Sequence, residues 1–188
     1  PGLGLQVDTD IQLQLDYIFG FGFGFQSAAA VGDLFYFDTA GVTASGEEFE
    51  LALSAVLDAN ASMGATLGFL QAQLAEIDDY HIGLEDFEEG ERPSGVFGTF
   101  SIDIKDTGTS ASDDRLTLAE IARVTAISDI FVAALRGVVD VDLRAELGFS
   151  SVDFFELGAD LHLYTDLEYT TSDGFGYAPP EFLFEGIY

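Results

Sequence analysis

The sequence predicts a mainly β protein of long antiparallel amphipathic strands, forming a sandwich or an elongated barrel-like sheet with one α-helix packed on it. Three observations predict this class. Apolar and polar residues alternate over long stretches, turn residues separate these stretches, and only one segment, at about 117–135, has helical spacing. The chain has 188 residues, which suffices for one domain. We therefore expect 1–188 to be a single β-rich module, as a segment of a larger or assembled protein.

The first strand is predicted over Leu3–Phe25, the longest alternation in the chain. Its odd-numbered residues are apolar apart from Thr9, and its even-numbered residues are polar or glycine apart from Ile18. Period two of this kind predicts a strand with one buried face. About 23 residues at roughly 3.3 Å each would span some 75 Å. We therefore expect either a bend in the glycine-containing half or an unusually elongated sheet.

Further strands are predicted wherever the same alternation returns. The segment Ala65–Ile77 changes phase at Phe69–Leu70, which predicts a bulge. The other strand segments are Glu48–Leu57, Val96–Ile104, Val139–Phe149, Phe155–Tyr169 and Glu181–Tyr188. Together they predict a sheet whose strands exceed the usual five or six residues.

One helix is predicted at about 117–135. Apolar residues recur there at helical spacing, from Leu118 to Leu135. Thr117 and Glu120 have the spacing of a capping box, and Gly137 is a suitable stop. We expect this helix to pack on the sheet.

The charge of the chain restricts its partners. It carries 34 Asp and Glu against 6 Lys and Arg, a net charge of −28, yet it is 48% hydrophobic and therefore expected to fold. Such a field repels nucleic acid and anionic membrane surfaces and attracts cations. Salt or bound calcium would offset the self-repulsion, which favours a saline or extracellular setting. Cysteine is absent, and no apolar run is long enough for a transmembrane helix.

The loop between the strand ending near Ile104 and the helix is the candidate metal site. It is rich in oxygen ligands, and its second half fits the spacing of a calcium loop that ends on a Glu, although Asp114 stands where glycine is expected. Capping by Thr117 and Glu120 alone is the competing interpretation. The candidate ligands for calcium are Asp106, Asp113, Asp114, Thr117 and Glu120. The acidic stretch from Asp78 to Arg92 is a second cation candidate.

Several stretches of the chain resemble a known class of protein. The sequence FGTFSIDIKD at 97–106, followed by DDRLTLAEI at 113–121, is similar to β-rich repeat modules of very large, acidic, secreted bacterial proteins. The opening LQVDTDIQLQLDYIFGFG and the short FYFDT at 35–39 fit the same likeness. The resemblance implies a tandem surface or matrix module with a degenerate calcium loop of the EF-hand or dockerin type.

Phenylalanine and glycine alternate at the end of the first segment. Four aromatic side chains on one face suit a core, whereas glycines on the other face let another backbone or subunit approach closely. A bent strand within one domain is the alternative. The last segment, with its own phenylalanines, could pair with a neighbouring sheet edge. The candidate interface residues are Phe19, Gly20, Phe21, Gly22, Phe23, Gly24, Phe182 and Phe184.

The function that these patterns favour is structural. We expect a self-associating module of a secreted or cell-surface bacterial assembly, such as a fibre, matrix or adhesin, with neighbouring copies as partners and surface glycans as a further class. No nucleophile elbow, phosphate-binding loop, dinucleotide fingerprint or zincin motif occurs, so we expect no enzyme activity. Two alternatives stay open: a carbohydrate-binding or hydrolytic β-domain of a salt-adapted organism, and an outer-membrane β-barrel.

Overall fold

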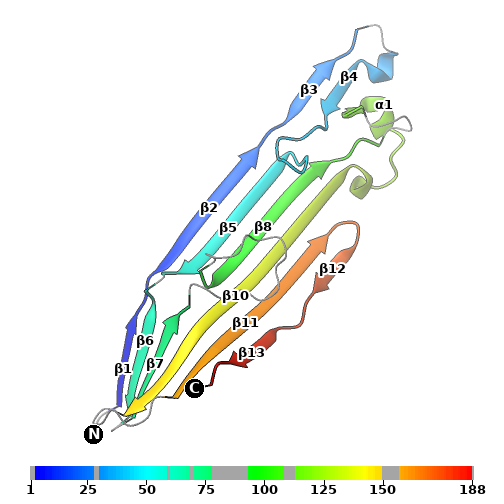
Figure 1. Cartoon of the computed structure of the whole chain (residues 1–188). Coiled ribbons are helices and arrows are strands. Elements are labelled where there is room, and N and C mark those ends of the chain that lie inside the picture. The colour runs from blue at the N-terminus through cyan, green and yellow to red at the C-terminus, as the bar shows by residue number, and fades with distance from the viewer. Residues whose placement is uncertain are drawn as a thin grey trace.

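The computed structural model describes residues 3–27, 30–58, 60–67, 70–77, 93–107, 113–149 and 157–187. These residues form an elongated blade in which the longest strands run along the long axis (Figure 1). The prediction of a mainly β fold of long antiparallel strands is confirmed. No helix among the described residues has the length and apolar character needed to cross a membrane.

The larger sheet has ten strands, and every neighbouring pair in it is antiparallel. Its strand order is β1-β6-β7-β10-β8-β5-β2, and β11 lies on the other side of β10 and pairs with both β12 and β13. The bounds are β1 Leu3–Asp8, β2 Ile11–Phe19, β5 Phe49–Leu57, β6 Ser62–Leu67, β7 Leu70–Glu76, β8 Gly95–Ile104, β10 Phe131–Phe149, β11 Leu157–Thr170, β12 Gly174–Tyr177 and β13 Glu181–Glu185.

A smaller sheet caps one end of the blade (Figure 1). It contains β3 (Gly22–Phe25), β4 (Phe35–Asp38) and β9 (Arg115–Thr117), in that order. The short helix α1 (Leu118–Ile121) follows β9 directly. Two 3-10 turns, η1 and η2, cover Val31–Asp33 and Ile127–Asp129.

The buried apolar cluster of the described residues lies where the small sheet meets the large one. Leu116 of β9 is 1% exposed and packs with Ile104 and Ile130, which are also buried. Three half-buried side chains surround them: Phe37, Ile121 and Val124. Apolar burial is therefore concentrated at this junction.

The first predicted strand is three strands. The chain is interrupted at residues 9–10 and again at 20–21, and each piece has a different partner: β1 pairs with β6, β2 with β5, and β3 with β4. The second interruption falls in the glycine-containing half, where a bend was expected. The first was not expected, because the alternation continues through Thr9 and Asp10 and only the change of partner marks the boundary.

The predicted helix at 117–135 is wrong in its extent. Its start is correct, since Thr117 and Glu120 form a capping box. The helix ends after four residues, and residues 131–135 belong to the nineteen-residue strand β10. Phe131, Ala133 and Leu135 also fit period two. This stretch pairs with β8 from Phe131 onward, and β11 joins on the other side from Ala134, so strand pairing satisfies its backbone groups.

The predicted bulged strand at Ala65–Ile77 is a pair of strands. Residues 62–67 form β6 and residues 70–76 form β7, with Leu67 opposite Leu70. The change of phase at Phe69–Leu70 therefore reflects a reversal of the chain, not an extra residue. The remaining predicted strands agree with the structure to within a few residues, apart from β10, which begins at Phe131.

Leu116 should contribute strongly to stability. We expect Leu116→Ala to lower the free energy of unfolding by about 2–5 kcal/mol, because it leaves a cavity in the junction cluster. Leu118→Ala is the matched control, since Leu118 is 48% exposed and should change stability by less than about 0.5 kcal/mol. Urea denaturation measures both, and equal effects would show that the junction cluster is not the core.

Candidate functional site

Antiparallel register aligns the apolar residues of neighbouring strands in rows across the sheet. Residues directly opposite each other in an antiparallel pair carry their side chains on the same face. Phe49 lies opposite Ile102 in this way, and Leu161 lies opposite Phe184. One row crosses six strands and consists of Tyr17, Leu51, Phe100, Leu135, Tyr169 and Phe175.

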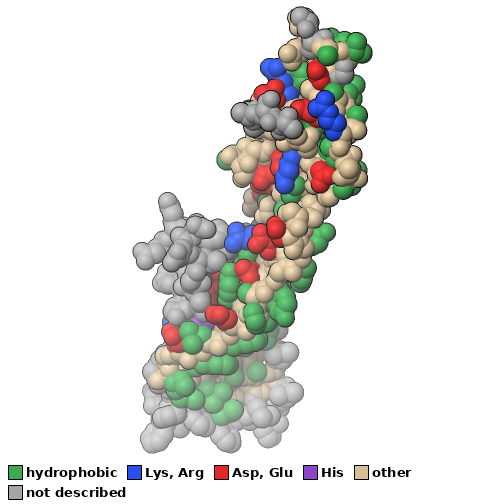
Figure 2. All heavy atoms as spheres, turned by 90° about the vertical axis from the view of Figure 1, so that its right-hand side faces the viewer, with side chains coloured by type: hydrophobic (Ala, Val, Ile, Leu, Met, Phe, Trp, Pro, Cys, Tyr) green, Lys and Arg blue, Asp and Glu red, His purple; other side chains and the backbone are tan. Residues whose placement is uncertain are grey.

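We call this side of the ten-stranded sheet the apolar face. It carries the odd-numbered residues of β2, β5, β11 and β12, of β6 up to Ala65 and of β10 up to Leu147, together with the even-numbered residues of β7, β8 and β13. Among these described strand positions, Glu76 at the end of β7 is the one charged residue. Seen from the β13 side of the blade, hydrophobic side chains gather in patches on the surface (Figure 2).

The apolar face is exposed along its edges and mostly half-buried across its central strands, which corrects the expectation that it lies in a core. Leu13 is 74% exposed, Tyr17 72% and Phe182 64%. The alternation in the sequence predicts strands with one face in a core. Period two fixes which side chains share a face, but it does not supply a second layer to cover them. A contiguous exposed apolar surface of this kind is typical of a contact site.

A hollow interrupts the apolar face near its centre. Gly98 of β8 lies opposite Gly137 of β10, so two neighbouring strands lack side chains there. The hollow around Gly137 has a volume of about 400 Å³ and is lined mainly by apolar groups, including Val96, Leu167 and Tyr177. A side chain from a partner surface could enter it.

The opposite face of the sheet is polar and contains buried hydrogen bonds. His162 of β11 and Asp142 of β10 lie directly opposite each other, and Nδ1 of the imidazole is 2.6 Å from Oδ1 of the carboxylate. Both side chains are almost fully buried. The Ser94 hydroxyl accepts from the Asp142 amide and donates to the Asp142 carbonyl. Ser94 is thus tied to backbone, unlike a catalytic serine, which bonds its histidine base.

A second polar contact joins the same two strands. The Arg144 guanidinium donates two hydrogen bonds to Asp160, at 2.8 and 3.0 Å. These bonds lower the pKa of Asp160 below its usual range. The sequence showed that these residues lie on polar strand positions, but it did not show that Asp142 faces His162 or that Arg144 faces Asp160. Both pairings are set by the register between β10 and β11.

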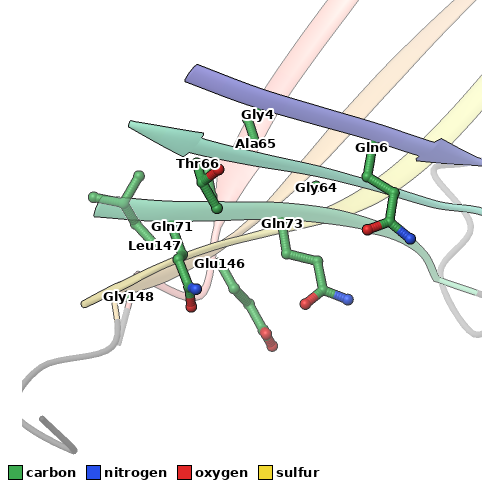
Figure 3. Close-up of a pocket in the computed structure, with 11 residues that line it drawn as sticks. Gly4, Gln6, Gly64, Ala65, Thr66, Gln71, Gln73, Glu146, Leu147 and Gly148 are labelled. Carbon is green, nitrogen blue, oxygen red and sulfur yellow. The ribbon is translucent and has the colours of Figure 1, made fainter. Parts of the chain in front are cut away.

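A shallow glutamine-lined hollow lies on the polar face near the β1 end of the sheet (Figure 3). It is formed by two cross-strand rows from β1, β6, β7 and β10, and its volume is about 430 Å³. Gln6, Gln71, Gln73 and Glu146 supply its polar groups. These groups could bind hydroxyls, but the lining has no aromatic ring on which a sugar would stack.

The predicted calcium ligands are placed as follows. Thr117 and Glu120 bond each other in the helix cap, with Oε2 of Glu120 accepting from both the amide and the hydroxyl of Thr117 at 2.8 Å. Asp106 Oδ2 accepts from the Asp113 amide at 3.0 Å. Asp114 has a positive φ of 57°, which Asp tolerates better than most residues.

Calcium binding stays a prediction. Among the described residues, no group of three or more acidic or histidine side chains is gathered to hold a metal ion. Residues 108–112 of the loop and the whole second cation candidate, at 78–92, lie outside the described residues. The contacts that are described belong to helix capping and to a turn.

The predicted interface residues lie along the two outer edges of the blade. Phe19, Phe23, Phe182 and Phe184 are each between 64% and 68% exposed, and Phe21 is 49% exposed. The space above the glycines is used within the chain: an added Cβ would meet Val42 at Gly20, Asp38 at Gly22 and Tyr36 at Gly24. The glycines therefore accommodate neighbouring side chains of the same chain, and the phenylalanines remain available to a partner.

Comparison with known proteins identifies no relative. No family model, no curated protein and no solved structure matches this chain. The case for function therefore depends on the surfaces described above.

Buried Glu48 should make stability depend on pH. It is 4% exposed, one oxygen accepts from the Ile104 amide at 2.6 Å, and burial raises its pKa above the ordinary value of 4.5. A raised folded-state pKa means that ionised Glu48 destabilises the fold at pH 7. Acidification through the raised pKa protonates the folded state first and recovers that stability.

We therefore expect Glu48→Gln to be more stable than the natural chain at pH 7. This difference in stability should shrink as the pH is lowered, because the natural chain recovers stability when Glu48 is protonated. Gln keeps an oxygen for the Ile104 amide. Thermal unfolding across pH measures the difference between the two proteins, which removes the effect of the other acids. Parallel pH profiles would contradict the assignment to Glu48.

Proposed function

We propose that this chain is a structural module of a secreted or cell-surface bacterial assembly, such as a fibre, matrix or adhesin, and that it self-associates through the apolar face. The observation that carries the proposal is the continuous apolar face of the ten-stranded sheet, which is exposed along its edges and mostly half-buried across its centre. Covering such a surface stabilises an assembly by roughly 25 cal/mol per Å² of apolar area removed from water. In an isolated copy the apolar face stays in contact with water.

The occupant that best fits the apolar face is a second copy of the chain. Two sheets pack face to face about 10 Å apart, with side chains of both inner faces interdigitating. This arrangement turns the two polar faces outward. Asp142, Asp160 and Asp166 lie on the polar face, so apolar faces can meet without bringing these acids together. Contact between polar faces would instead place these acids directly against those of the second copy.

A lipid surface is a poorer partner for the same face. The strands at the outer edges, β2 and β13, are exposed along their whole lengths, and within the described part of the chain each pairs on one side. Unpaired backbone groups cost several kcal/mol in hydrocarbon. The net charge would also be repelled by anionic headgroups. An aqueous protein partner avoids both penalties.

A charge placed on the apolar face should weaken self-association. Val96 and Thr99 are exposed residues of similar size on the same strand, β8, but they lie on opposite faces. We expect Val96→Lys to shift the chain towards monomer by at least tenfold in dissociation constant, because it buries a charge in the contact. Sedimentation velocity over a concentration series measures this.

Thr99→Lys is the matched control and should leave the mass distribution close to that of the natural chain. If the natural chain is a monomer at high concentration, or if both variants behave alike, self-association through the apolar face is rejected.

Ions should stabilise the module in two separable ways. Added NaCl should raise the midpoint of thermal unfolding, because it screens the self-repulsion of the excess acids. Millimolar Ca²⁺ should raise it further than Mg²⁺ at equal ionic strength if the loop from Asp106 to Glu120 binds calcium, as we propose. Asp106→Asn keeps the acceptor for the Asp113 amide but should reduce the calcium response. Identical responses to Ca²⁺ and Mg²⁺ would reject the calcium site.

A further inference from the structure

We propose that two copies also pair side by side through β2, antiparallel, about a twofold axis at Leu15. This inference depends on the proposed self-association and specifies a second, lateral contact with a defined register. Its first support is the exposure of β2: all nine residues are exposed, and among the described residues β2 pairs with β5 alone, on one side. The strand IQLQLDYIF contains no Pro and no Lys, the residues with which proteins commonly protect a sheet edge.

The hydrogen bonds to β5 show which backbone groups face the open edge. The Asp58 amide donates to the Asp10 carbonyl, and the Gly20 amide donates to the Glu48 carbonyl. Because bonding alternates along an antiparallel pair, the even-numbered residues of β2 bond to β5. The odd-numbered residues therefore direct their amides and carbonyls outward, towards a new strand. These are the same residues that carry the apolar side chains.

The register is the one that pairs the whole of β2 with the whole of the partner's β2. When Leu15 lies opposite the partner's Leu15, all nine residues of β2 are paired, with Ile11 opposite the partner's Phe19 and Leu13 opposite the partner's Tyr17. The outward-facing residues then meet one another along the whole strand. The apolar face continues without interruption from one copy to the next, because opposite residues in an antiparallel pair share a face.

The same register is favourable on the polar face. It places Asp16 opposite the partner's Gln14, so that a carboxylate meets an amide donor. Within one chain, Gln14 Nε2 already reaches Asp16 Oδ2 at 2.6 Å, which shows that the two side chains have the reach to bond. A twofold axis at Asp16 would oppose two Asp16 carboxylates, and one at Leu13 would oppose Asp16 and Asp10. Like charges directly opposite each other destabilise a strand pair.

The other outer edge is less suited to this pairing. Strand β13 has five residues, begins directly after Pro179 and Pro180, and has Glu181 and Glu185 at its two ends. Short length, proline and charge are devices that protect an edge from pairing. The longer edge strand β2 lacks proline and lysine, and its single charged residue, Asp16, has a suitable partner.

Single-cysteine variants test the register, since the chain has no cysteine of its own. In the proposed dimer, Gln14 is two residues out of register with its own copy, about 7 Å along the strand, whereas Gln12 is six residues, about 20 Å, from its copy. We expect Gln14→Cys to form a cross-linked dimer in high yield with a short bifunctional thiol reagent. Gln12→Cys, with the same residue type on the same face of the strand, should not.

Asp16→Cys should cross-link as efficiently as Gln14→Cys, because Asp16 is also two residues from its copy. Dimers held only through apolar faces keep these polar-face thiols far apart. If the natural chain self-associates by sedimentation but Gln14→Cys does not cross-link, the lateral pairing is wrong and the proposed function survives. If Gln14→Cys cross-links but Asp16→Cys does not, the twofold axis lies at Gln14 and the Leu15 register is wrong. A chain that remains monomeric overturns both proposals.

Discussion

Backbone hydrogen bonding along β10 unites the described sheet, because this nineteen-residue strand connects groups of strands that otherwise do not pair. On one side it pairs with β8 through its first half and with β7 through its last seven residues. On the other side it pairs with β11 over fourteen residues. Its own side chains divide accordingly: apolar positions line the exposed face, whereas Asp142 and Arg144 bond to β11 on the polar face. Faces, edges and register therefore all follow from the placement of this strand.

Alternation predicted much of this fold and misjudged specific parts of it. It located most strands and assigned their residues to faces correctly, since period two is a local property of the backbone. It failed at residues 131–135, where helical and strand spacing coincide and only pairing with β8 and β11 decides. It also placed the apolar residues of β2 in a core, because a strand pattern contains no information about the layer above it.

The candidate surface was predictable in composition but not in arrangement. Phe19, Phe182 and Phe184 were identified from sequence, and they lie exposed at the edges. The rows that join these edges across β5, β8 and β10 depend on strand order, which a single sequence does not specify. The glycines between the phenylalanines were ambiguous for a related reason: the residues that fill their space, such as Tyr36 and Asp38, belong to a neighbouring strand.

Both ends of the described chain lie at the same end of the blade, on its two outer edges, where β1 starts and β13 finishes (Figure 1). A mechanical load applied through these two ends would pull across the strands, not along them. Hydrogen bonds loaded in this direction break one after another, as in a zipper, and resist less force than bonds loaded together in shear. A chain held only by its ends would thus peel from its edges inward. Copies paired along β2, as proposed, would cover that strand's open edge, so a pair would resist such peeling better than one copy.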